Sequence, residues 1–222
     1  MDLERLNARD HLGLRRADLP DKGAHFVQIV ASEFTAAAAV CPIFLTKSPD
    51  TGQFYAGAMF GFEPGEILPR GPAAFVPLDL ERQGFYLMSD GSIAIDPGHG
   101  RFVARGGARL FEADGQPSPA LRRLQHVLAQ LSVGVAQTGA FIQALVAQGL
   151  VEPIDLSLSF DDGRSLSLAG LYTVSLDALG EREDDVVLDL FRRGYLQLIY
   201  AMAGSLKQVS VLANLRNERL AV

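Results

Sequence analysis

The chain contains a single cysteine, Cys41, and its N-terminus lacks the features of a signal peptide. A lone cysteine cannot form an intramolecular disulfide, which fits a reducing compartment, and its apolar setting before Pro42 predicts an inert, buried thiol. The N-terminal sequence MDLERLNARDHLGLRR is charged throughout and has no apolar run. The longest apolar stretch, residues 34–45, is too short to cross a bilayer. We therefore expect a soluble, cytoplasmic protein without a membrane span.

Motifs of common catalytic sites are also missing. The sequence has no G-x-S-x-G for a serine nucleophile, and neither G-x-x-x-x-G-K-[ST] nor G-x-G-x-x-G for a phosphate. None of the four histidines stands in H-x-D, H-x-E or H-E-x-x-H, patterns that supply metal ligands. The formal net charge of −6 disfavours nucleic acid as a partner. A small basic patch of Arg15, Arg16 and Lys22 lies in a charged segment, residues 1–23, which we expect to be a surface arm.

The composition and the pattern of the chain indicate an α+β protein. Hydrophobic residues make up 48% and charged residues 21% of the sequence, which leaves enough apolar side chain for a buried core. Short strands separated by turns favour a mainly antiparallel sheet over alternating βαβ units. We expect a single α+β domain over residues 1–222, with a soft seam near residues 105–118 and two long helices in the C-terminal half.

The front half of the chain is predicted to be rich in strands. Ser32 is expected to cap a short apolar helix over residues 34–40, which Pro42 ends. The dipeptide Asp90-Gly91 indicates a tight hairpin between two strands. The expected strands cover residues 24–31, 43–46, 53–62, 75–78, 85–88, 92–95 and 102–104, and the second and third of them should pair as a hairpin.

The back half is predicted to combine helices with a second hairpin. Ser118 and Pro119 open a long helix that ends at Gly149. Gly134 and Gly139 lie inside it, each costing about 1 kcal/mol relative to alanine, so we expect a close neighbour or a mild bend there. The remaining elements are a hairpin over residues 154–168 with one buried face, a turn capped by Ser175, and helices over residues 185–193 and 195–215.

Five residues are candidates for a functional site. Glu33 opens an otherwise apolar helix, so a buried carboxylate there needs a partner. Arg82 is the expected partner, either in a structural ion pair or in a ligand site. Tyr172 is the third candidate for ligand binding. Asp96 and His99 could share a metal site in one loop, with a third ligand from elsewhere in the chain.

Loosely spaced aromatic residues, prolines and glycines form a recognisable pattern along most of the chain. They lie in H-F-V-Q-I-V-A-S-E-F-T-A-A-A-A-V-C-P-I-F-L (25–45), F-V-P-L-D-L-E-R-Q-G-F-Y-L (75–87), S-I-A-I-D (92–96), L-F-E-A-D-G-Q-P-S (110–118), G-L-V-E-P-I-D-L (149–156), G-L-Y-T-V-S (170–175) and G-Y-L-Q-L-I-Y-A-M-A-G-S-L-K-Q (194–208). This order resembles the SapC-like family of bacterial proteins, which is distinct from an ABC-transporter permease of the same short name. Cys41-Pro42 and Gly84-Phe85 depart from the family, which usually has a Tyr-Pro-like and a Pro-Phe step at these places.

The resemblance implies a relation to bacterial surface-layer loci. It assigns no defined reaction to particular residues of this chain. Family members often occur beside genes for tryptophan-halogenase-like proteins, cupin-like proteins and TonB-dependent receptors. We therefore expect a non-catalytic accessory or binding protein whose partner is a halogenase-like enzyme or an uptake-system protein. One alternative is a metal-assisted, oxygenase-like enzyme with a site around Glu33, Arg82, Asp96 and His99. Another is a structural homodimer built on the two long helices. No cofactor is assigned.

Overall fold

The chain folds into two compact units, neither of which is contiguous in sequence. The computed structural model describes residues 2–17, 24–69 and 75–220. The first unit comprises Met1–Asp21 and Val76–Val133, and the second comprises Lys22–Phe75 and Gly134–Val222. Antiparallel sheets combined with several helices confirm the α+β class. The single-domain assignment stays a prediction, and Lys22 of the expected basic patch lies outside the described residues.

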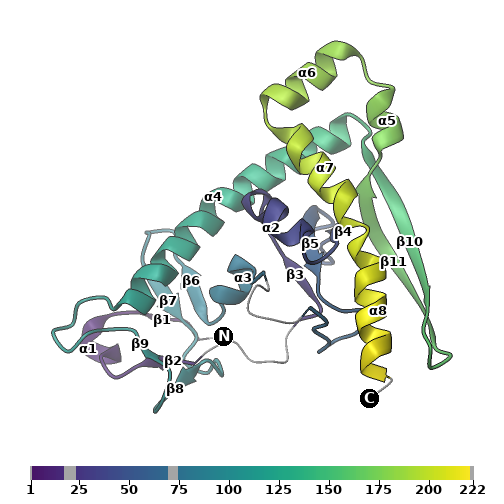
Figure 1. Ribbon diagram of the computed structural model, residues 1–222. Coiled ribbons are helices and arrows are strands. Elements are labelled where there is room, and N and C mark those ends of the chain that lie inside the picture. The colour runs from purple at the N-terminus through teal and green to yellow at the C-terminus, as the bar shows by residue number, and fades with distance from the viewer. Residues whose placement is uncertain (1, 18–23, 70–74, 221–222) are drawn as a thin grey trace. The chain divides into compact units, whose positions relative to one another are not determined.

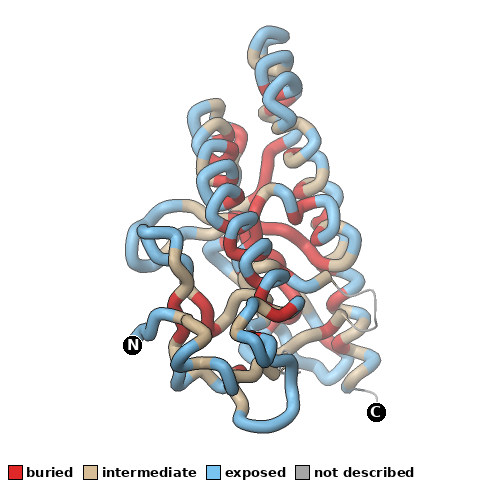
Figure 2. The backbone as a smooth tube through the Cα atoms, turned by 90° about the vertical axis from the view of Figure 1, so that its left-hand side faces the viewer, coloured by how far each residue is buried: buried red, intermediate tan, exposed pale blue. Residues whose placement is uncertain are grey.

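The second unit is built on a five-stranded antiparallel sheet with the order β10–β11–β4–β5–β3. β4 and β5 form the predicted hairpin, and β11 joins it with Tyr172 opposite Leu45. The first three residues of β4 and the last four of β5 are buried. Buried segments of the chain are drawn in red in Figure 2. The strands are β3 (Phe26–Gln28), β4 (Ile43–Lys47), β5 (Phe54–Met59), β10 (Val151–Ser159) and β11 (Ser165–Val174).

Helices of the second unit bury one face of the long β10–β11 hairpin. Leu212 of α8 shares a core with Phe44 and Leu171, and alternate hairpin residues such as Leu156 and Leu166 pack against it. α8 runs alongside this hairpin in Figure 1. The predicted hairpin with one buried face is therefore confirmed. The elements are the 3-10 turn η1 (Ala31–Glu33), α2 (Phe34–Ala38), α5 (Leu176–Gly180), α6 (Asp184–Arg192), α7 (Tyr195–Ser205) and α8 (Gln208–Leu220).

The first unit contains two small antiparallel sheets, with the orders β1–β7–β6 and β8–β2–β9. β6 and β7 form the hairpin predicted at Asp90-Gly91. Leu6 and Leu14 pack against the core of this unit, so the expected surface arm is wrong for these residues, whereas residues 2–5 are exposed as expected. The elements are β1 (Glu4–Arg5), α1 (Ala8–His11), β2 (Arg15–Arg16), α3 (Leu78–Glu81), β6 (Phe85–Leu87), β7 (Ile93–Ile95), β8 (Phe102–Val103) and β9 (Ala108–Arg109).

The long helix α4 (Pro119–Ala147) contributes residues to both units. It begins as predicted, because Ser118 Oγ accepts a hydrogen bond from the Leu121 amide at 3.2 Å. Gly149 follows its end with a φ of 63°. Among the described helices, α4 alone has the length and composition of a membrane-spanning helix, with a mean hydropathy of 1.2. The helix buries one apolar stripe, and 33% of its most apolar stretch is buried. The buried residues are Leu121, Leu124, Leu128, Leu131, Phe141, Ile142 and Leu145.

The strand predicted over residues 75–78 is wrong, because Leu78–Glu81 form the short helix α3. Pro77 precedes the helix at its N-cap, and the first turn is acidic, as the helix dipole prefers. Arg16 and Arg101 donate hydrogen bonds to the carbonyls of its last turn at 2.9–3.0 Å. These tertiary hydrogen bonds outweigh the β-like local pattern.

The last helix, predicted over residues 195–215, is divided into α7 and α8. Ser205, at the end of α7, is fully buried. Its hydroxyl donates to the Met202 carbonyl at 2.6 Å and accepts from the Ile43 amide at 2.9 Å. The helix therefore ends where it binds the backbone at the start of β4.

Candidate functional site

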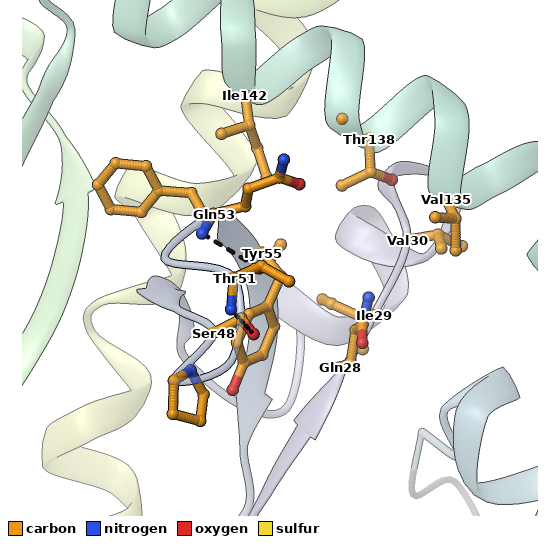
Figure 3. A pocket seen from close by; sticks show the side chains of 14 residues that line it. Gln28, Ile29, Val30, Ser48, Thr51, Gln53, Tyr55, Val135, Thr138 and Ile142 are labelled. Carbon is orange, nitrogen blue, oxygen red and sulfur yellow. Dashed lines mark hydrogen bonds between the residues drawn. The ribbon is translucent and has the colours of Figure 1, made fainter.

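The second unit carries a cavity of about 460 Å³, which lies in the size range of small-molecule sites. The cavity lies between the second half of α4 and the turn that connects β4 to β5. Figure 3 shows Thr138 and Ile142 extending from α4 on one side, with Gln53 and Tyr55 on the other. Gln28 and Ile29, at the end of β3 and just after it, close the remaining wall, and Ser48, Thr51 and Gly139 also line the cavity.

The β4–β5 turn forms one wall of the cavity. The Thr51 amide donates to Ser48 Oγ, and the Gln53 amide donates to Thr51 Oγ1, both at 3.3 Å. Gly52 adopts a φ of 67°, which a glycine accepts without steric cost. These hydrogen bonds fix the course of the backbone where Gln53 leaves the turn.

The opposite wall is held by two side-chain hydrogen bonds to the backbone. A carboxylate oxygen of Glu33 accepts from the Val30 amide at 2.9 Å, and Thr138 Oγ1 accepts from the Ala31 amide at 2.8 Å. Glu33 is 6% exposed. The predicted N-cap at Ser32 is therefore wrong, because the helical turn begins at Ala31 and the Glu33 carboxylate binds the amide before it. Through this hydrogen bond, Glu33 fixes the backbone of Val30, which lines the cavity.

The lining of the cavity combines neutral hydrogen-bonding groups with apolar surface. Its polar groups are the amides of Gln28 and Gln53 and the hydroxyls of Ser48, Thr51 and Tyr55, while the Thr138 hydroxyl donates to the Gly134 carbonyl at 2.6 Å. No Asp, Glu, Lys, Arg, His or Cys is among the described lining residues. A charged ligand would leave water without a counter-charge, which is costly, whereas hydroxyl groups can exchange water for these amides and hydroxyls. The geometry suits an uncharged, hydroxylated molecule.

The predicted pair of Glu33 and Arg82 involves residues of different units. In the first unit, Arg82 binds Asp79, with its Nη2 at 2.7 Å from a carboxylate oxygen. Its guanidinium also lies 5.7 Å from the ring centroid of Tyr86. Asp79 and Tyr86 of the same unit therefore contact the Arg82 guanidinium, and the pairing of Arg82 with Glu33 stays a prediction.

Asp96 and His99 lie together in one turn of the first unit. The His99 amide donates to the Asp96 carbonyl at 2.9 Å, and the Asp96 carboxylate accepts from the Gly98 amide at 3.1 Å. His99 Nδ1 accepts from the Arg101 amide at 3.3 Å. Within the described parts of the chain, no three His, Cys, Asp or Glu side chains are grouped to hold a metal. The metal site at Asp96 and His99 stays a prediction.

Tyr172 supports a lining residue of the cavity. Its ring contacts Phe54 edge to face, with the centroids 4.9 Å apart. Lys47 Nζ lies 5.0 Å from the Phe54 centroid and 5.5 Å from that of Tyr172. A role of Tyr172 in ligand binding stays a prediction, and this contact would make that role indirect.

Cys41 is fully buried, as the sequence predicts. Its thiol donates to the Ala37 carbonyl at 3.3 Å. Burial raises the pKa of Cys41 to about 12, because the thiolate loses its hydration. The thiol is therefore protonated at neutral pH and is no nucleophile.

Sequence reasoning missed the cavity, although one of its signals is visible in the sequence. A Cβ added at Gly134 would meet Val30 Cγ2 at 2.7 Å, which confirms the close neighbour expected there. A Cβ added at Gly139 would meet nothing within 4 Å, and Gly139 lines the cavity. The signal in the sequence is the glycine inside the helix, and the structure shows open space beside it.

The chain is thus an α+β protein with an open cavity, and none of the described residues that line this cavity is charged. The SapC family model matches residues 6–212, and the chain belongs to this family. Comparison with curated proteins and with solved structures gave no match.

Proposed function

We propose that this SapC-family protein is a non-catalytic accessory protein that binds an uncharged, hydroxylated small molecule in the cavity of its second unit. The supporting observation is the lining, which offers amides and hydroxyls but no charged group, histidine or thiol among the described residues. General acid–base catalysis needs a titratable group near the operating pH. A sugar is the ligand class that fits best, because its hydroxyls can bind Gln28 and Gln53 while a C–H face packs on the Tyr55 ring.

We also propose the setting in which the protein acts. The resemblance to SapC-like proteins supports a role with bacterial surface-layer or TonB-dependent nutrient-uptake systems. It also supports a protein partner, namely a tryptophan-halogenase-like enzyme or an uptake-system protein. The lone, buried cysteine is compatible with a cytoplasmic location. In this setting the bound sugar would report nutrient supply to the partner.

Binding can be tested with the purified full chain and a panel of glucose, maltose and maltotriose. We expect at least one sugar to raise the thermal midpoint of unfolding, because a ligand that binds the folded state stabilises it. Gly139→Leu should abolish this increase, because Gly139 lines the cavity and a Cβ there points into open space. Ala136→Leu is the matched control, since Ala136 is exposed on the same helix and does not line the cavity.

Two outcomes would contradict the proposal. No response of the wild-type protein to any of the three sugars would overturn the ligand class. Stoichiometric iron or zinc in the purified protein, lost in His99→Ala, would favour the metal-assisted enzyme instead.

A further inference from the structure

The small sheet β8–β2–β9 of the first unit has an inner and an outer face. On the inner face, Arg16 pairs with Phe102 of β8, and the Phe102 ring contacts the buried Phe85 with centroids 5.1 Å apart. Successive residues of a strand point to opposite faces. The row that contains Arg15, with Val103 and Arg109 as its cross-strand partners, therefore points away from the core of this unit.

Two arginines are direct neighbours on this outer face. Arg15 and Arg109 are opposite each other in the antiparallel β2–β9 pair, which places their Cβ atoms about 5 Å apart. Like charges in such a pair destabilise the sheet. Arg109 is exposed, so its guanidinium group is accessible to a ligand in solution.

A third arginine lies in the turn that Arg15 contacts. Arg15 Nη1 donates to the carbonyls of Gly106 and Gly107 at 3.4 and 3.2 Å. Arg105 directly precedes these glycines and is exposed. Gly107 has a φ of 61°, and a Cβ there would collide with the Arg16 carbonyl, so the turn lies directly on β2. These contacts hold the backbone of the turn that follows Arg105 against β2.

These three arginines lack the carboxylate partners that Arg82 and Arg123 of this unit have. Arg82 binds Asp79, and Arg123 binds Glu81, with N–O distances of 2.7 Å in both pairs. Within residues 2–17, 24–69 and 75–220, no carboxylate forms a salt bridge with Arg15, Arg105 or Arg109.

We propose that Arg15, Arg105 and Arg109 bind the phosphate monoester group of a small soluble ligand. A phosphate carries close to two negative charges and three terminal oxygens, which match several guanidinium forks. Nucleic acid and anionic membranes would require an extended positive surface, whereas the chain has a net charge of −6. This site lies in the first unit and does not depend on the sugar cavity of the second unit.

Charge reversal at Arg109 gives a sharp test with the full chain. Arg109→Glu places a carboxylate opposite Arg15, so we expect a higher thermal midpoint of unfolding than wild type without phosphate. Inorganic phosphate should raise the midpoint of the wild type more than sodium chloride does at equal ionic strength. It should raise that of Arg109→Glu no more than the chloride does. Arg192→Glu, at an exposed position on α6, is the matched control and should retain the wild-type response.

Calorimetric titration with glucose 6-phosphate gives a second readout. We expect glucose 6-phosphate to bind at least tenfold more weakly to Arg109→Gln, a variant without charge reversal. Glucose should not compete with glucose 6-phosphate for this site. Equal phosphate effects on wild type and Arg109→Glu would overturn the site, because they would show the general exclusion of phosphate from protein surfaces. Arg109-dependent binding to phosphatidylglycerol vesicles without binding of either phosphate compound would overturn the small soluble ligand.

Discussion

At the scale of single residues, the two glycines inside α4 have opposite structural roles. Gly134 is buried and allows Val30 to approach the helix backbone. Gly139 has no neighbour at the position of a Cβ and borders the cavity instead. Both lower the helix propensity of α4, but only Gly134 is required by packing.

Alanine at each glycine should therefore change stability in opposite directions. Gly134→Ala should lower the free energy of unfolding by about 1–3 kcal/mol, as overpacking does. Gly139→Ala should raise it by up to about 1 kcal/mol through helix propensity. Urea unfolding measures both values. Equal destabilisation by both substitutions would show that Gly139 is packed against a neighbour.

Cys41 gives a pH-dependent prediction. Burial raises the thiol pKa from 9.0 to about 12, so between these values the folded chain keeps a proton that the unfolded chain loses. This contribution to stability is fully present below pH 9 and is lost as pH rises toward 12. Between pH 8 and 10 the free energy of unfolding should fall by about 1.4 kcal/mol more in wild type than in Cys41→Ala. Urea unfolding at both pH values measures this difference, and equal pH dependence of the two proteins would show that the thiol titrates normally.

At the scale of elements, the break between α7 and α8 depends on a tertiary hydrogen bond. Ser205→Ala removes the acceptor of the Ile43 amide, and a buried unsatisfied donor costs about 1–3 kcal/mol. Ser210→Ala, at an exposed position in α8, should change the free energy of unfolding by less than about 0.5 kcal/mol. Urea unfolding distinguishes the two, and a neutral Ser205→Ala would show that the helix ends for another reason.

Elements with strong local signals could be predicted from the sequence. Asp90-Gly91 located a hairpin, and Ser118 with Pro119 located the start of α4. Elements fixed by distant partners could not be predicted. Arg101 binds the carbonyls of α3, and Ser205 binds β4, across separations that a local pattern does not encode.

At the scale of the whole molecule, the chemistry is divided between the two units. The second unit holds a neutral cavity, while the first holds the outward arginines of the β8–β2–β9 sheet. Among the candidate residues, Glu33 supports the cavity wall, whereas Arg82, Asp96 and His99 belong to the other unit. Sequence reasoning identified Glu33 but not the cavity, because the lining residues come from segments far apart in the chain and carry no catalytic motif.

The neutral lining of the cavity predicts that it binds an uncharged, hydroxylated ligand. The most direct test is an amide chemical-shift titration of the full chain with maltose, with Gly139→Leu as the blocked variant. We predict that the largest shifts occur at Ala31, Thr51 and Gln53, which form the cavity walls or lie next to them, and that they disappear in Gly139→Leu. Shifts that are absent from these amides, or that persist unchanged in Gly139→Leu, would contradict the claim.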